Sequence, residues 1–286
     1  MGCIITESFY AGEGNQLFVY LYGIIVSNKF NTPYIHPGIP TLNISPSMNL
    51  NNNNNLRYIK ITNYLEFLEK KTIDGNFNYI LDYGYNPTIE DYNLFLPYID
   101  FLRNFFPKQD LHHDNDLVYH LRAGDALMNL NYSYFNGEKL KNVIDDIKYE
   151  RLYVVTNLKK HETWTMKDLL DYKEKLIKYG DCGANYTNDS IINSSQMEES
   201  LSNLNGVIKV LNDRNAIWKS DTILNDFNFI RSFDKIMIGV STYSWWAAIL
   251  SNAKEVYAPK NWKYLKGDRN KNLPFVELDN WKALDY

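Results

Sequence analysis

Short apolar segments alternate with longer segments of helical periodicity along this 286-residue chain. Consecutive parallel strands need a crossover connection, usually a helix, so the alternation predicts parallel sheets covered by helices on both faces. In the second half the expected strands are residues 116–122, 151–157, 206–212, 235–241 and 255–259. The expected helices are residues 136–147, 165–179, 220–233 and 243–251. The predicted fold class is therefore α/β, with a Rossmann-like unit in this half.

The first half begins with an apolar strand, a glycine-containing loop and a helix. Residues 3–10 are mostly apolar, and apolar positions recur at helical spacing from Asn15 onward. A further strand is expected at 79–85 and a helix at 89–105. These elements predict a second α/β unit, because strand, loop and helix in this order form its repeating element.

The polar, charged segment 107–116 separates the two halves and predicts a domain boundary. We expect an N-terminal lobe of residues 1–112 and a C-terminal Rossmann-like lobe of residues 113–262. The tail, residues 263–286, is expected to pack back on the first lobe.

Composition excludes several classes of protein. The net charge of −4 gives no electrostatic reason to expect nucleic acid or a membrane surface as a partner. Cys3 and Cys182 are the two cysteines, which is too few for a disulfide framework or a zinc cluster. The longest apolar stretches, 17–26 and 236–250, contain polar residues and are too short to span a membrane. With no signal peptide in the first residues either, we expect a soluble cytoplasmic protein, of bacteria or of a virus-infected cell.

Parallel sheets bind ligands outside the carboxyl ends of their strands, so the polar residues at those ends are candidate site residues. The segment "YHLRAGD" contains His120, Arg122, Gly124 and Asp125 at the end of the first strand of the second half. A guanidinium group there can present two parallel donors to a diphosphate. The alternative is that Arg122 simply pairs with Asp125.

The segment "GVSTYSWWAAIL" joins a strand to a helix that is expected to begin at its two tryptophans. Ser241, Thr242 and Ser244 lie at this junction, where hydroxyl groups and free N–H groups can bind an anion. The alternative is ordinary capping of the helix by serine or threonine, with Trp245 in packing.

Two further strand ends and one loop carry polar residues. Thr156 and Asn157 end one expected strand, and residues 212–214 end another. At each of these two strand ends, the polar residues can contact a base or a ribose, or they can form a plain turn. The loop "GEGNQ" begins with Gly12 and Gly14, which allow a tight bend close to a ligand. It lacks the Gly-Lys-Ser/Thr of a phosphate-binding loop and the full dinucleotide fingerprint.

Three motifs, in order, resemble the α1,2-fucosyltransferases and the wider fucosyltransferase group: "GEGNQLFVYLYG", "YHLRAGD" and "STYSWWAAIL" followed by "VYAPKNW". The resemblance covers residues 12 to about 262, and its Trp-Trp segment is the most specific part. Two positions depart from the family pattern. Ala123 stands where the family usually has a second basic residue, and Glu13 stands where many α1,2 enzymes have an uncharged residue.

The resemblance implies a GT-B enzyme, with two Rossmann-like lobes whose parallel sheets face a cleft. It implies an inverting transfer of L-fucose from GDP-β-L-fucose to a glycan hydroxyl, forming an α1,2 linkage, with no metal and no cofactor. "DND" at 114–116 is the one string similar to a metal-binding D-x-D, and we interpret it as boundary loop. The donor-binding residues are then expected to be Gly12, Gly14, Asn15, Gln16, His120, Arg122, Gly124, Thr156, Asn157, Ser241, Thr242, Ser244 and Trp245.

Catalysis would involve Arg122, Asp125 and a group that removes the proton of the acceptor hydroxyl. In some protein fucosyltransferases the glutamate of a similar Gly-Glu-Gly loop is that base, and Glu13 matches its position. Many α1,2 enzymes work through an oxocarbenium-like state with no dedicated base, which is one alternative. Asp125 is the other, although its place in the turn suits it better to orienting Arg122 or His120.

Other functions stay open at this point. The same fold can use a different GDP- or UDP-linked sugar, or the chain can be a non-catalytic, sugar-binding relative. An NAD-binding Rossmann protein would need the full glycine fingerprint. The acceptor and the oligomeric state are not indicated, although the irregular segments 31–110 and 180–203 are expected to shape the acceptor site.

Overall fold

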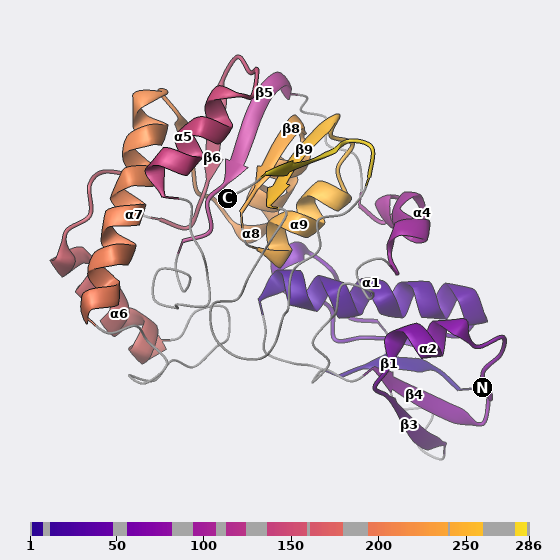
Figure 1. Ribbon diagram of the computed structural model, residues 1–286. Helices are drawn as coiled ribbons and strands as arrows, with labels where there is room; N and C mark the ends of the chain where they lie inside the picture. The colour runs from indigo at the N-terminus through magenta and orange to yellow at the C-terminus, as the bar shows by residue number, and fades with distance from the viewer. Residues whose placement is uncertain are drawn as a thin grey trace. The chain divides into compact units, whose positions relative to one another are not determined.

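The computed structural model describes residues 2–7, 12–47, 56–81, 94–106, 113–123, 136–158, 161–179, 194–239, 241–259 and 278–284 (Figure 1). The chain divides into two compact units, Met1–Pro107 and Lys108–Tyr286. This division lies slightly before the boundary that was predicted after residue 112.

The first unit contains a four-stranded sheet in which every pair of neighbouring strands is parallel. Its strands, in the order β2-β1-β4-β3, are β1 (Ile4–Thr6), β2 (Tyr34–Ile35), β3 (Arg57–Ile61) and β4 (Phe77–Leu81). Its helices are α1 (Glu13–Phe30), η1 (Pro40–Leu42), α2 (Tyr64–Glu69), η3 (Leu96–Tyr98) and α4 (Ile99–Arg103). Helix α1 follows the central strand β1 and is buried over most of its circumference.

Helix α1 begins at Glu13, two residues before the predicted start at Asn15. Gly12 is its N-cap, and the Gly12 carbonyl accepts bonds from the backbone N–H groups of Asn15 (2.9 Å) and Gln16 (3.1 Å). Asn15 therefore lies in the first turn and does not cap the helix. The prediction failed because glycine caps a helix by its backbone conformation alone, without a side-chain signal.

The other predictions for the first unit are met in part. The first strand ends at Thr6 instead of residue 10, with residues 8–11 outside the described part of the chain. The strand predicted at 79–85 is β4, and residues 82–93 are not described. Within the helix predicted at 89–105, the structure has η3 and α4.

The second unit contains a six-stranded sheet, also with all neighbouring pairs parallel. In the order β10-β9-β8-β5-β6-β7, its strands are β5 (His113–His120), β6 (Leu152–Val155), β7 (Ile217–Lys219), β8 (Phe233–Ile238), β9 (Glu255–Pro259) and β10 (Trp281–Leu284). Its helices are α5 (Gly137–Asp145), α6 (Met166–Tyr179), α7 (Ser194–Asp213), α8 (Ile223–Arg231) and α9 (Thr242–Ile249). Both units are therefore Rossmann-like in having parallel sheets and helical crossovers.

The alternation of β5 places its apolar side chains in the main core of this unit. Leu117, Tyr119 and Leu121 pack in one cluster with residues of α5 and α7 such as Leu140 and Leu211. The intervening His120 contacts Tyr243 of α9, with ring centroids 5.6 Å apart. Helices α5 and α7 thus cover one face of the sheet, while α9 covers the other.

The strand predicted at 206–212 is wrong, because these residues form the end of helix α7. Their apolar side chains continue a helical pattern from Leu204 through Ile208 to Leu211, and all of them are buried in the same core. Gly206 faces Gly137 of α5, and a Cβ atom on Gly137 would lie 2.5 Å from the Gly206 carbonyl oxygen. The two glycines let the helices approach closely.

Two more expectations for the second unit are wrong, and the predicted tail contains a strand. The segment 180–203, expected to be irregular, contains the start of α7 at Ser194, with residues 180–193 outside the described chain. Residues 212–214 end a helix instead of a strand, and the next strand is β7. Within the tail 263–286, which was expected to pack on the first lobe, Trp281–Leu284 form β10 of the second sheet, where Trp281 pairs with Val256.

The "DND" segment 114–116 lies inside β5 and is not a boundary loop. The Asp116 side chain is fully buried and accepts bonds from Arg151 Nη2 (2.7 Å) and Nε (3.1 Å), while His113 Nδ1 lies 3.2 Å away. Burial alone would raise the pKa of Asp116, but the bonds from Arg151 and His113 hold it below its usual value. Asp116 is therefore a structural anchor in the first half of the strand.

No helix in the described ranges is both long and apolar enough for a membrane crossing.

Candidate functional site

The strand order of the second sheet reverses between β5 and β8. From β5 the chain adds β6 and then β7 toward one edge, and it then crosses back to place β8 on the other side of β5. Open α/β sheets bind ligands outside the carboxyl ends of the strands at such a reversal. The register pairs His120 with Val155 and with Ile238, so β5, β6 and β8 end at the same level.

His120 and Arg122 lie at the end of β5. His120 is buried, and its Nδ1 atom has no hydrogen-bond partner among the described residues. Burial, and to a smaller extent the charge of Arg122, lowers the pKa of His120 to about 3, so the imidazole is neutral at pH 7. Arg122 is half-buried one residue beyond the buried Leu121. This strand end thus combines a cation with a buried neutral ring that still has a free ring nitrogen.

Gly239 determines how closely β8 approaches this strand end. A Cβ atom at residue 239 would lie 2.7 Å from the His120 carbonyl oxygen and 3.6 Å from the Arg122 nitrogen. The first distance is too short for a side chain, so Gly239 is required by the contact between the two strands. It was not among the predicted site residues, since its partners are distant in sequence.

Helix α9 begins at Thr242, so Trp245 and Trp246 lie within it and do not start it as predicted. Ser241 is the N-cap residue, but its side chain makes no capping bond, and the first turn contains no acidic residue. The N–H groups of a first turn have no partner within the helix, and the helix dipole makes that end positive. The start of α9 is therefore suited to binding an anion.

Ser244 and Trp245 hold α9 in place. The Ser244 hydroxyl donates to the Ser241 carbonyl oxygen at 3.2 Å. Trp245 is buried, with its ring edge-on to Trp246 at 4.8 Å and near Trp281 of β10 at 6.4 Å. The contacts of Trp245 agree with the packing alternative, and the Ser244 hydroxyl bonds within the first turn without capping an N–H group. Ser241 and Thr242 lie at the start of the helix.

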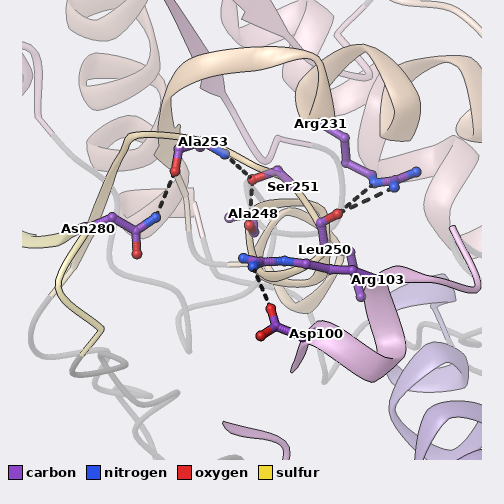
Figure 2. A network of polar contacts seen from close by, with 8 residues as sticks. All are labelled: Asp100, Arg103, Arg231, Ala248, Leu250, Ser251, Ala253 and Asn280. Carbon is purple, nitrogen blue, oxygen red and sulfur yellow. Dashed lines mark hydrogen bonds and ion pairs between the residues drawn. The ribbon is translucent and has the colours of Figure 1, made fainter. Parts of the chain in front are cut away.

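The other end of α9 is anchored by a buried arginine (Figure 2). Arg231, the last residue of α8, donates from Nε and Nη2 to the carbonyl oxygen of Leu250, both at 3.3 Å. Burial lowers the pKa of Arg231 to about 10, so the guanidinium stays charged at pH 7 and complements the negative end of α9. Asn280 bonds to the Ala253 carbonyl oxygen just beyond the helix at 2.8 Å, which links this end to β10.

At the end of β6, Thr156 shapes the turn and Asn157 faces solvent. Thr156 is buried, and its hydroxyl accepts from the Leu158 N–H at 3.3 Å. This arrangement is the plain-turn alternative for Thr156. Gly124 and Asp125 lie outside the described residues.

In the first unit, Gly12 to Gln16 follow the carboxyl end of the central strand β1. Gly12, Glu13 and Gln16 are half-buried, Gly14 is buried and Asn15 is exposed. Glu13 is the first residue of α1, where a negative charge complements the helix dipole.

In the described residues, no group of three or more His, Cys, Asp or Glu side chains lies close enough together to hold a metal ion. A cavity of about 360 Å³ lies beside the edge strand β3, lined by residues that include Lys60, Glu66, Lys70 and Asp74. None of the predicted site residues lines it.

The chain matches no model of a known protein family and no curated protein. Its function is therefore inferred from the residues at the carboxyl ends of the strands in the two sheets.

Proposed function

We propose that the chain is an inverting glycosyltransferase that moves L-fucose from GDP-β-L-fucose to a hydroxyl group of a glycan, forming an α1,2 linkage. The observation that carries the proposal is that β5, which Arg122 follows, and β8, which precedes α9, are neighbouring strands that end at the same level at the reversal of strand order. A nucleoside diphosphate is the ligand class that such a site suits. The choice of fucose rests on the three ordered sequence motifs.

The chemistry requires stabilisation of the leaving diphosphate. Negative charge grows on its terminal phosphate as the bond to the sugar breaks. Arg122 would neutralise that charge with two donors, and the N–H groups at the start of α9, together with the Ser241 hydroxyl, would bind the phosphate oxygens. Removing one such contact typically lowers the rate by about a hundred- to a thousandfold.

The neutral ring of His120 has a distinct role in this proposal. A neutral imidazole has one donor and one acceptor nitrogen, so it can bond to a phosphate or a hydroxyl without a proton being released or taken up. His120 would orient the donor and would not act as a base, because its pKa is far below 7.

The proposal includes a GT-B arrangement of two α/β units, with the acceptor bound by the first unit and the donor by the second. It assigns Glu13 as the base that takes the proton of the acceptor hydroxyl. This assignment is supported by the position of Glu13 at the start of α1, within a Gly-Glu-Gly sequence that comes after β1. The proposed reaction uses no cofactor and no metal.

The test measures GDP release from GDP-fucose in the presence of EDTA, with GDP-mannose and UDP-sugars as controls. We expect release from GDP-fucose alone, and loss of release in Arg122→Ala. Arg57→Ala is the matched control, since Arg57 is exposed on the edge strand β3 of the first unit.

Each other outcome has a definite meaning. Release from another nucleotide sugar only would overturn the fucose assignment and keep the enzyme class. Loss of release on adding EDTA would overturn metal independence. No release from any donor, with no GDP binding by calorimetry, would favour a non-catalytic sugar-binding protein.

A further inference from the structure

Three aromatic side chains from separate elements meet in the first unit. Tyr20 comes from α1, Tyr34 from β2, and His36 follows β2 directly. The Tyr20 ring lies 4.8 Å from the His36 ring and 6.1 Å from the Tyr34 ring, and Tyr34 and His36 lie 5.0 Å apart. All three side chains are half-buried, so the group, here called the aromatic wall, is accessible from outside.

Contacts with β1, α1 and Gly38 hold the aromatic wall in place. The Tyr34 hydroxyl is 2.8 Å from the Thr6 hydroxyl at the end of β1. Gly23 leaves room for the ring, because a Cβ atom there would lie 2.1 Å from Tyr34. Among the described residues the His36 ring makes one hydrogen bond, which its Nδ1 accepts from the Gly38 N–H at 3.1 Å. Burial lowers the pKa of His36, which favours the neutral ring. Because Nδ1 accepts a bond, the proton of the neutral ring is on Nε2.

Helix α1 connects the aromatic wall to the proposed base. Glu13, Gln16 and Tyr20 are half-buried and lie three and seven residues apart, which places them on one face of the helix. The other residues from 13 to 26 are buried, except for Asn15. Two helical turns separate Glu13 from Tyr20, or about 10 Å along the axis. This distance is longer than a single pyranose ring.

We propose that the aromatic wall of Tyr20, Tyr34 and His36 binds the second sugar of a glycan acceptor whose first sugar reacts at Glu13. A pyranose ring has C–H groups on its faces and hydroxyl groups at its rim. Half-buried aromatic faces and one N–H donor match that pattern, as in other ligand sites with aromatic linings and few polar groups. The inference rests on the proposed function, and it makes the acceptor at least a disaccharide.

The test compares a monosaccharide acceptor, methyl β-galactoside, with a disaccharide acceptor, lactose, at saturating GDP-fucose. Tyr20→Ala is expected to raise the KM for lactose about five- to tenfold, as the loss of one aromatic contact implies. The KM for methyl β-galactoside and the hydrolysis of GDP-fucose without acceptor should not change. Tyr20→Phe keeps the ring and should behave as the wild type does.

Tyr58→Ala is the matched control, because Tyr58 is an exposed tyrosine on β3, at the opposite edge of the sheet from β2. Equal changes for both acceptors in Tyr20→Ala, or none, would overturn the aromatic wall as a sugar site while the proposed function stands. If the wild type releases no GDP at all, the proposed function fails separately. Lactose binding is then measured by ligand-observed NMR, and binding unaffected by Tyr20→Ala, or no binding, would overturn the inference.

Discussion

Replacing Gly239 with alanine tests whether the contact between β8 and β5 sets the geometry of the donor site. The added Cβ atom would lie 2.7 Å from the carbonyl oxygen of His120, which is closer than real Cβ contacts come. Because the obstructing atom is backbone, relief requires a shift of one strand by a few tenths of an ångström. Overpacking of this kind typically lowers the free energy of unfolding by about 1–3 kcal/mol. In a domain of this size, each kcal/mol lowers Tm by about 2–4 °C. The strand end that moves carries Arg122.

Gly75→Ala is the matched control for this substitution, since no atom lies within 4 Å of a Cβ atom at residue 75. Thermal unfolding of both variants is compared with that of the wild type, and GDP-fucose hydrolysis is measured on the folded proteins. We expect Gly239→Ala to lower Tm and to raise the KM for the donor, and Gly75→Ala to leave both nearly unchanged. Equal Tm values for the two variants would refute the steric argument. A lowered Tm with an unchanged KM would separate the contact from the donor site.

Three further predictions concern single side chains. The pKa of Asp116 is lower in the folded state than its unfolded-state value of 3.8. The carboxylate therefore stabilises the fold at pH values above 3.8, and this stabilisation is lost as the pH falls through the folded-state pKa. The Tm difference between wild type and Asp116→Asn should therefore shrink from about pH 6 to about pH 3; a constant difference would contradict it. Glu13→Gln should lower the rate of transfer about a hundredfold or more while hydrolysis of the donor changes less, and wild-type transfer would rule out Glu13 as the base. Asn136 caps α5 by accepting from the Lys139 N–H at 2.8 Å, so Asn136→Ala should reduce the free energy of unfolding by about 1 kcal/mol, measured by urea denaturation.

Local pattern was sufficient for most elements of the second unit. Apart from residues 206–212, each strand and helix predicted there is confirmed at its position, with ends that differ by a few residues. Within β5, Leu117 and Tyr119 enter the core cluster, whereas His120, which follows Tyr119, contacts Tyr243 of α9. A period of two residues in a buried strand is a property of the backbone and needs no knowledge of its neighbours.

A short apolar run does not distinguish a buried strand from part of a buried helix. Residues 206–212 have the length and composition of a buried strand, and only their continuity with Leu204 shows the helix. Gly206 is the first residue of the predicted strand, whereas in the structure it lies in α7 and lets α5 approach closely. The strand that follows, β7, is only three residues long and mostly exposed, so it carries little signal.

The sequence by itself determined the α/β class, the division into two units, and the residue types offered at the strand ends, because these depend on local periodicity and composition. Tertiary structure decided which strand ends are neighbours, since the reversal between β5 and β8 is not encoded in any local pattern. It also decided that His120 is buried and neutral, that Gly239 has no room for a side chain, and that Tyr20, Tyr34 and His36 meet. Burial and contact depend on residues far apart in the chain, and only the packed fold brings them together.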